Sequence, residues 1–284
     1  MKYKNEGEPK MKLKFGVRAH DVAKKTDIDN LLSGVNDLDL EYIQLVIPKA
    51  LKECDYSHEN ILRIQNSLRQ HRIKVAMLGA YFNPVHCNKE IVMSGIENFK
   101  RNIEIAKELG CKYVGSETGS YNGSPWTYVP KNHTQEGFMK TQKIFSELIK
   151  YAQKINVNVL FEPAWAHIIY DVPMAKKFLD SFHMPNVFIT IDLYNLLYEG
   201  NFEQRNEIFE KALRTFKNQV KIIHLKDGKV VDGKKIQLSP GQGQFDYPFM
   251  LHCIERYCPQ AILIFEGVDR KNIAISLEKL KNIL

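Results

Sequence analysis

Long apolar runs, paired cysteines and a glycine-rich nucleotide loop are all missing from this chain of 284 residues. No stretch of about 20 apolar residues occurs, and the first dozen residues are too polar for the hydrophobic region of a secretory signal. The five cysteines are an odd number and include no C-x-x-C pair, which excludes a disulfide framework and a thiolate zinc site. We therefore expect a cytoplasmic protein without a membrane span, whose residues 1–11 form a flexible extension.

The charge balance is basic, but it lacks the pattern of a nucleic-acid surface. The chain has 40 Lys and Arg against 33 Asp and Glu, a net charge of +7. Basic residues such as Lys24–Lys25, Lys176–Lys177 and Lys234–Lys235 are mixed with acids, and no arginine-rich stripe with interleaved aromatics occurs. We interpret them as solvated positions on helices or at chain ends, which disfavours nucleic acid as a partner. With 44% apolar residues, the chain has enough material for a large core.

One unit repeats along the chain: a short β-branched run followed by a longer amphipathic segment. This alternation is typical of βα units with a parallel sheet. An open, doubly wound sheet usually has a G-x-G-x-x-G turn after its first strand, and Gly16-Val17-Arg18-Ala19 is not one. Eight units instead predict a single (β/α)₈ barrel domain spanning 1–284. The expected strands are Leu13–Val17, Tyr42–Ile47, Lys74–Leu78, Tyr113–Gly115, Val157–Phe161, Val187–Ile191, Val220–Ile223 and Ile262–Phe265.

Four of the later runs are each followed directly by a side chain that can bind metal. They are Glu162, Asp192, His224 and Glu266. Strand ends of a barrel converge on one mouth, so we expect these groups to meet. Three carboxylates with one imidazole suit a single Mn²⁺, Mg²⁺ or Co²⁺, and Zn²⁺ is less favoured because no thiolate contributes.

Two of these carboxylates, Glu162 and Glu266, are also candidates for acid–base catalysis. Each can present an oxygen to one face of a substrate carbon, while the metal polarises the neighbouring carbonyl and stabilises an enediolate. One glutamate would remove a proton and the other would return it. The pattern predicts an isomerase or epimerase acting on a small carbohydrate.

The residues around these positions resemble a known family. The motifs are Glu162-Pro163, Asp192, His224-Leu225-Lys226-Asp227, the stretch 240–246 (PGQGQFD) and Glu266-Gly267. Together they resemble the sugar phosphate isomerase/epimerase group of xylose isomerase-like TIM barrels, over nearly the whole chain. The resemblance implies one divalent metal, commonly Mn²⁺, held by Glu162, Asp192, His224 and Glu266, with both glutamates as acid–base catalysts. It also implies a possible homo-oligomer.

Two departures from that family keep other activities open. Asn195 stands where ketose 3-epimerases usually have a histidine, and Lys226 with Asp227 stands where they commonly have an arginine. The H-x-K-D form is similar to inosose dehydratases, so dehydration of a cyclic polyol on the same site is an alternative. A zinc apurinic endonuclease-like DNA repair enzyme is less favoured because its site needs more histidines. A barrel that keeps the metal without catalysis is a further alternative.

Several other residues follow predicted strands and are candidates for contact with substrate. We expect this role for His20, Glu117, Trp165, Asn195 and Lys226. For the first three, packing or solvation of a loop explains the residue equally well. Trp126, close to several small residues, indicates either a flap over the site or an ordinary connection. The lysine is compatible with a phosphate or carboxylate on the substrate, and phosphorylation of the sugar stays open.

Overall fold

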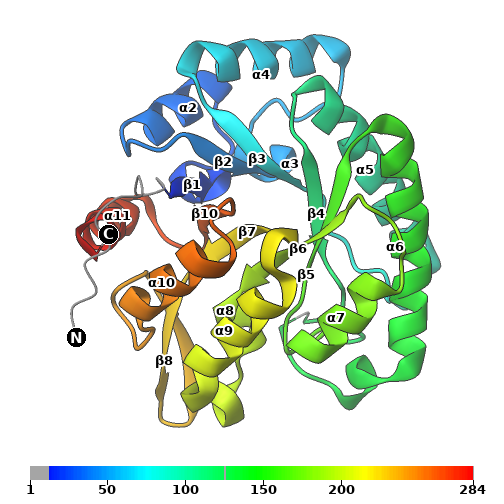
Figure 1. Cartoon of the computed structure of the whole chain (residues 1–284). Helices are drawn as coiled ribbons and strands as arrows, with labels where there is room; N and C mark the ends of the chain where they lie inside the picture. Colours follow the sequence, from blue (N-terminus) through cyan, green and yellow to red (C-terminus); the bar gives the residue numbers. More distant parts are fainter. Residues whose placement is uncertain (1–12, 125, 284) are drawn as a thin grey trace.

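The computed structural model describes residues 13–124 and 126–283, and the extension predicted over residues 1–11 lies outside these ranges. Eight parallel strands close into a barrel in the order β1-β10-β7-β6-β5-β4-β3-β2 (Figure 1). Each lies within two residues of its predicted run, which confirms the (β/α)₈ prediction. Their bounds are β1 Lys14–Arg18, β2 Tyr42–Leu45, β3 Lys74–Gly79, β4 Tyr113–Glu117, β5 Asn158–Glu162, β6 Val187–Asp192, β7 Val220–Leu225 and β10 Ile262–Phe265.

Eight helices of nine or more residues surround the barrel, and shorter ones lie in the loops (Figure 1). The long helices are α2 Ile28–Asn36, α4 His58–His71, α5 Lys89–Glu108, α6 Gln135–Ile155, α7 Val172–Asp180, α9 Arg205–Phe216, α10 Tyr247–Tyr257 and α11 Arg270–Ile283. The short ones are α1 Ala19–Val22, α3 Ile47–Ala50 and α8 Leu193–Leu196, with 3₁₀ turns η1 Pro130–His133, η2 Glu199–Gln204 and η3 Lys217–Gln219. No helix among the described residues is long and apolar enough to cross a membrane.

The helices form where the sequence supplies both an apolar face and end signals. In α4, Ile61, Ile64 and Leu68 recur at helical spacing and are buried. The Ser57 hydroxyl accepts a hydrogen bond from the Asn60 amide at the start, and Arg72 ends the helix in the left-handed conformation. The apolar faces pack against the outside of the barrel. Inside the barrel, a smaller cluster fills the space: Ala76, Met77, Leu160, Ile222 and Ile264.

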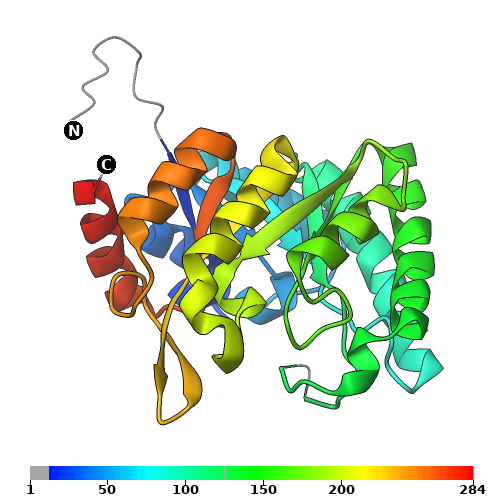
Figure 2. The ribbon, with the colours of Figure 1, turned by 60° about the horizontal axis from the view of Figure 1, so that its bottom comes forward.

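An antiparallel hairpin between β7 and α10 is absent from the sequence prediction. It consists of β8 (Asp227–Val231) and β9 (Lys234–Leu238), joined by Asp232 and Gly233, which both have positive φ. An Asp-Gly pair is the preferred sequence for such a two-residue turn, so this signal was present but not used. Lys234–Lys235 lies in a strand, and the expected helical or terminal position is wrong. The hairpin projects from the end of the barrel opposite the start of β1 (Figure 2).

Asp227 anchors the loop that follows this hairpin. Its buried carboxylate accepts hydrogen bonds from the backbone amides of Gly228, Gly241, Gly243 and Phe245, at 2.7 to 3.0 Å. A Cβ at Gly243 would lie 2.3 Å from the carboxylate, so only glycine allows this approach. Both oxygens of Asp227, the aspartate of the H-x-K-D motif, therefore accept hydrogen bonds that hold this loop. Asp246 caps α10 by accepting a hydrogen bond from the Phe249 amide.

We expect Asp227→Ala to destabilise the protein by about 3 kcal/mol, because it leaves several buried amides without an acceptor. Urea unfolding followed by circular dichroism measures the change in unfolding free energy. Asp180→Ala is the matched control, since Asp180 is exposed and pairs only with Lys176 on the surface. Equal stability of the two variants would contradict the anchoring role.

Candidate metal centre

Four acidic or imidazole side chains meet at the carboxyl ends of neighbouring strands. Glu162 ends β5, Asp192 ends β6, His224 lies one residue before the end of β7, and Glu266 directly follows β10. The register pairs Asp192 with His224 across β6 and β7. All four residues are buried, and one ligand atom from each lies within 4.8 Å of the others. The barrel thus brings together the four residues predicted as metal ligands.

The imidazole nitrogen of His224 lies at the centre of this cluster. Its Nδ1 is 2.6 Å from Glu266 Oε2, 3.4 Å from Glu162 Oε2 and 3.5 Å from Asp192 Oδ2. The other nitrogen, Nε2, is 2.7 Å from the side-chain oxygen of Gln44, whose amide group donates to the Tyr81 hydroxyl at 2.7 Å. This arrangement assigns the proton to Nε2 and leaves Nδ1 as the nitrogen that can bind metal.

The second oxygen of each carboxylate accepts a hydrogen bond from a residue outside the cluster. Asn195 donates from its side chain to Glu162 Oε1 at 2.7 Å and from its backbone to Asp192 Oδ1 at 3.1 Å. Arg18 donates to Glu266 Oε1 at 2.6 Å and is itself paired with Asp21. Such outer contacts fix the orientation of metal ligands. They leave Glu162 Oε2, Asp192 Oδ2 and Glu266 Oε2 directed toward His224.

The residues present fit a hard divalent cation. Asp192 Oδ2, His224 Nδ1 and Glu266 Oε2 are buried, and their close contacts are ion pairs within the cluster and with Lys226. Burying such atoms costs free energy unless a partner compensates, and a cation bound by all of them would do so. Three carboxylates and one imidazole match the ligands of Mg²⁺, Mn²⁺ or Co²⁺ better than those of a thiolate zinc site.

Positive side chains offset the charge of the carboxylates. Lys226 Nζ is 2.6 Å from Asp192 Oδ2 and 3.3 Å from Glu266 Oε2. Burial disfavours the charged imidazolium of His224, but the Glu266 and Glu162 carboxylates outweigh it and raise its pKa well above the ordinary value. Because a metal needs the neutral imidazole, a metal that binds at this site would release a proton.

The contact with Gln44 gives a first test of the site. We expect Gln44→Leu to weaken Mn²⁺ binding about 10-fold to 100-fold, because His224 loses the acceptor that fixes its tautomer and ring orientation. Competition titration against a metal-sensitive dye measures the affinity without any substrate. Gln65→Leu, a change of the same kind at the opposite end of the barrel, should leave it unaltered. Unchanged Mn²⁺ affinity in Gln44→Leu would contradict a role of Gln44 in orienting His224.

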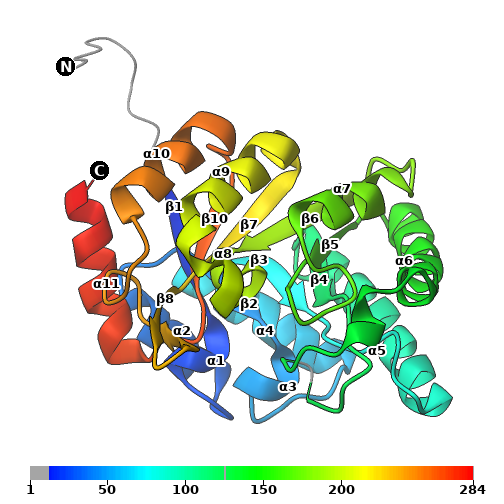
Figure 3. The same ribbon diagram turned by 90° about the horizontal axis from the view of Figure 1, so that it is seen from below.

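A cavity of about 790 Å³ is lined by Glu266 of the four candidate ligands and lies at the end of the barrel from which the β8–β9 hairpin projects; Figure 3 shows the ribbon at this end. All five residues predicted to contact substrate line it: His20, Glu117, Trp165, Asn195 and Lys226. Burial and the Glu162 and Glu266 carboxylates raise the pKa of Glu117 to about 8, and burial together with Arg18 lowers the pKa of His20 to about 4. The cavity wall therefore carries a neutral imidazole and a carboxyl group that ionises only in weak base.

Sequence reasoning missed several residues of the mouth. Arg18 ends β1 and Gln44 lies within β2, where one amide in an otherwise apolar run was the available signal. Lys235 and Gln237 enter the cavity wall from the unpredicted hairpin. Burial lowers the pKa of Lys235 to about 8, and its ammonium donates to the carbonyls of Tyr194 and Leu197. His133, in the turn η1, contacts the carbonyl of the cavity residue Trp165 at 2.8 Å.

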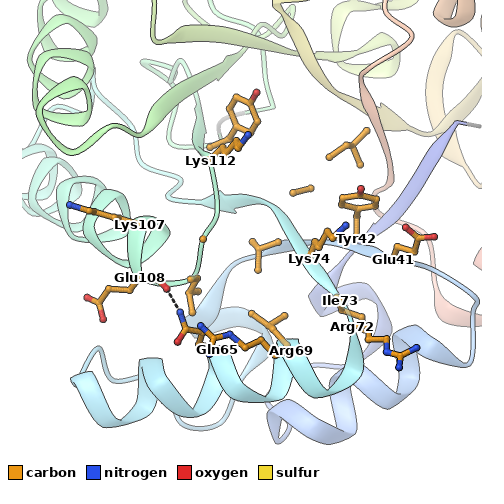
Figure 4. Close-up of a pocket in the computed structure, with 17 residues that line it drawn as sticks. Glu41, Tyr42, Gln65, Arg69, Arg72, Ile73, Lys74, Lys107, Glu108 and Lys112 are labelled. Carbon is orange, nitrogen blue, oxygen red and sulfur yellow. Dashed lines mark hydrogen bonds between the residues drawn. The ribbon is translucent and has the colours of Figure 1, made fainter. Parts of the chain in front are cut away.

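A second cavity, of about 1050 Å³, lies at the opposite end of the barrel (Figure 4). Its walls come from the starts of β2, β3 and β4 and from the last turns of α4 and α5. The cations Arg69 and Lys107 in those last turns complement the negative ends of the helix dipoles, which accounts for them structurally. Active sites of this fold lie at the carboxyl ends of the strands, so we assign no chemistry to this cavity.

Comparison with known proteins agrees with this architecture. The family model described as xylose isomerase-like TIM barrel matches residues 33–283. The chain therefore belongs to the xylose isomerase-like TIM barrel family. No curated protein matches it in sequence.

Solved structures with the same fold include several sugar-converting enzymes. A D-tagatose 3-epimerase-like protein is 17% identical, with a TM-score of 0.75, covering 95% of this chain and 97% of its own. The 3-keto-D-glucoside 4-epimerase of E. coli is 17% identical, with a TM-score of 0.74 and coverage of 95% and 100%. A xylose isomerase-like protein of Mycobacterium smegmatis in complex with magnesium is 14% identical, with a TM-score of 0.71 and coverage of 96% of each chain. At these identities the likeness establishes the fold.

Proposed function

We propose that this protein is a divalent-metal-dependent isomerase or epimerase of a sugar or related polyhydroxy carbonyl compound. The observation that carries the proposal is the buried cluster of Glu162, Asp192, His224 and Glu266, which borders a cavity through Glu266. The names of the two sugar epimerases with the same fold support the same class of substrate. Mn²⁺ is our first choice of metal, with Mg²⁺, Co²⁺ and Zn²⁺ as alternatives.

A divalent ion held by these four residues would polarise the oxygens of a substrate carbonyl and a neighbouring hydroxyl. The protein itself supplies two carboxylates, Glu162 and Glu266, whose strands are separated by β6 and β7. One of them takes the proton from the carbon beside the carbonyl, and the electron pair of the broken C–H bond passes to the carbonyl oxygen. The other returns a proton to carbon. Return to the opposite face of the same carbon gives an epimer, and return to the former carbonyl carbon gives an isomer.

The contacts of the two glutamates explain how they stay ready for this task. Burial opposes ionisation of Glu266, but His224, Lys226 and Arg18 hold its pKa well below the ordinary value. It is therefore a carboxylate at neutral pH and can accept a proton. Asn195 fixes one oxygen of Glu162 and leaves the other directed toward His224. Arg18 and Asn195 act as positioning residues in this scheme.

Deuterium uptake from solvent tests the proposal. The enzyme, loaded with Mn²⁺, is incubated in D₂O with ketoses, inososes and sugar phosphates, and the recovered substrates are analysed by mass spectrometry and NMR. We expect one deuterium at the carbon next to the carbonyl of the true substrate. Failure of every compound to exchange, with one metal bound per chain, would contradict the proposal.

Dehydration of a cyclic polyol on the same site is the second candidate. Lys226 favours it, because a buried ammonium beside Asp192 and Glu266 can donate a proton to a departing hydroxyl group. Burial opposes the charge on Lys226, but Asp192 and Glu266 raise its pKa above the ordinary value. The D₂O experiment separates the two candidates, since elimination removes one water from the mass of an inosose. With one histidine among the four ligands, the site gives no support to a DNA repair enzyme.

A further inference from the structure

The outer part of the cavity is lined by aromatic rings that the proposed proton transfer does not use. We call Trp126, Tyr128, Trp165 and Tyr198 the aromatic rim, and all four line the cavity together with Lys226 and Glu266. Trp126 is 51% exposed and Tyr128 is 41% exposed. Within residues 13–124 and 126–283, they are the only aromatic residues among the exposed large hydrophobic side chains. Both exposed rings therefore lie at the mouth of the site.

The aromatic rim is held in place by contacts with two neighbouring loops. The Trp165 ring stacks on Tyr198 at 3.9 Å between centroids and on Tyr128 at 5.6 Å. Its backbone amide donates to the Asn195 carbonyl at 2.8 Å, which ties the loop after β5 to the loop after β6. Trp126 covers the buried His167 ring at 4.8 Å. A surface with this support exists before a ligand arrives, so a ligand does not have to order it.

The exposure of Trp126 and Tyr128 is not explained by packing within the chain. Trp126 has one ring neighbour among the described residues, and half of its surface still faces solvent. Large aromatic side chains with one covered and one open face are common in sites that bind rings of a ligand, because contact with the ring removes apolar surface from water. The open surface belongs to the cavity and not to a remote part of the molecule.

The size of the cavity agrees with a ligand larger than one sugar ring. Its volume of about 790 Å³ lies in the upper part of the range of roughly 300–1,000 Å³ that holds drug-sized ligands. The reacting carbon must lie beside Glu162 and Glu266, at the inner end. A sugar placed there lies at the polar end of the cavity, and the aromatic rim forms another part of the same wall.

We propose that the aromatic rim is a subsite for a second ring of the substrate, so that the substrate is a reducing disaccharide, or an aryl glycoside whose sugar carries a carbonyl group, and not a free monosaccharide. The inference rests on the proposed function, because the reacting sugar is placed by the metal centre. The apolar C–H face of a sugar ring, or an aromatic group, stacks against Trp126 and Tyr128. The inner sugar then enters with its hydroxyl groups toward the ligands.

The two tryptophans of the chain make this testable by fluorescence. The sequence contains only Trp126 and Trp165, and both line the cavity. Protein loaded with Mn²⁺ is titrated with matched probes: methyl and phenyl β-D-glucopyranoside, the same pair of galactosides, and cellobiose and lactose beside glucose and galactose. We expect the two-ring member of at least one pair to bind about fivefold or more tightly than its one-ring partner. Equal affinities, or no saturable change with any probe, would overturn the proposal.

A substitution then locates the preference for the second ring. Trp126→Ala keeps Trp165 as the reporter and should reduce the affinity for the two-ring probe to within about twofold of that for its one-ring partner. Met139→Ala removes an exposed apolar side chain of α6 that is no part of the cavity and should preserve the full preference. A preference that survives in Trp126→Ala would overturn the assignment. The two-ring probes also distinguish which kind of ring the rim binds, because the second ring of cellobiose is a sugar and that of the phenyl glycoside is aromatic.

Failure of the second subsite can be distinguished from failure of the proposed function. Deuterium exchange into a free ketose, together with equal affinity for one-ring and two-ring probes, would leave the metal centre and its reaction in place and remove only the second subsite. Tighter binding of two-ring probes, without deuterium exchange into any compound, would leave the second subsite in place and remove the proposed reaction.

Discussion

Replacing Glu266 with glutamine is expected to slow deuterium uptake at least about 100-fold in the substrate form whose proton Glu266 removes. An amide cannot accept the proton, and it also loses the charge that pairs with Arg18 at 2.6 Å. Glu162→Gln should stop uptake into the other form, since Glu162 acts on the opposite side of the reaction. The measurement is exchange in D₂O followed by NMR, under Mn²⁺ concentrations that saturate each variant.

Metal occupancy must be held constant for this comparison, because both glutamates are also predicted ligands. Each variant is therefore titrated with Mn²⁺ before the exchange is measured. Glu136→Gln, at an exposed position on α6, is the matched control and should exchange like the wild type. Undiminished exchange in Glu266→Gln with metal bound would remove the acid–base role from Glu266. Normal circular dichroism would establish that the fold is retained.

The second large effect is expected from His224→Ala. It removes the only nitrogen ligand, around which the three carboxylate oxygens lie at 2.6, 3.4 and 3.5 Å. We expect one metal per chain in the wild type, purified without chelator, and less than about a tenth of that in the variant under the same conditions. Elemental analysis by plasma mass spectrometry measures both.

The control for this experiment is His252→Ala, at an exposed position in α10. It removes an imidazole that faces solvent, so its metal content should equal that of the wild type. Full occupancy in His224→Ala would contradict the ligand assignment. About three zinc ions per wild-type chain would instead favour the nuclease alternative over an isomerase.

The barrel and the clustering of the four candidate ligands could be predicted because both depend on local order in the sequence. A parallel strand is short, apolar and β-branched, and its carboxyl end is marked by the first polar residue, as at Glu162 and Asp192. Once eight such strands are recognised, closure of the barrel places their ends together without further information. The proximity of side chains on neighbouring strands, such as Asp192 and His224, follows from the register of β6 and β7.

The partners of these ligands could not be predicted in the same way. Gln44 contacts a residue 180 positions away, and Arg18 contacts one 248 positions away. Such pairs depend on the shear of the barrel and on rotamers that no local pattern encodes. The hairpin could have been predicted, because Asp232-Gly233 is a turn signal. It was missed because Lys234–Lys235 was interpreted as a helical or terminal position.

The pairing of β1 with β10 has a consequence for how the protein matures. These strands come from opposite ends of the barrel sequence, and the Arg18–Glu266 contact spans them. Contacts at such separation form slowly, because the intervening chain must be ordered first. A nascent or truncated chain lacking β10 lacks Glu266 as well, so it cannot present the complete ligand set. If the cluster binds metal as proposed, tight binding requires closure of the barrel, and metal uptake during refolding would report that last step of assembly.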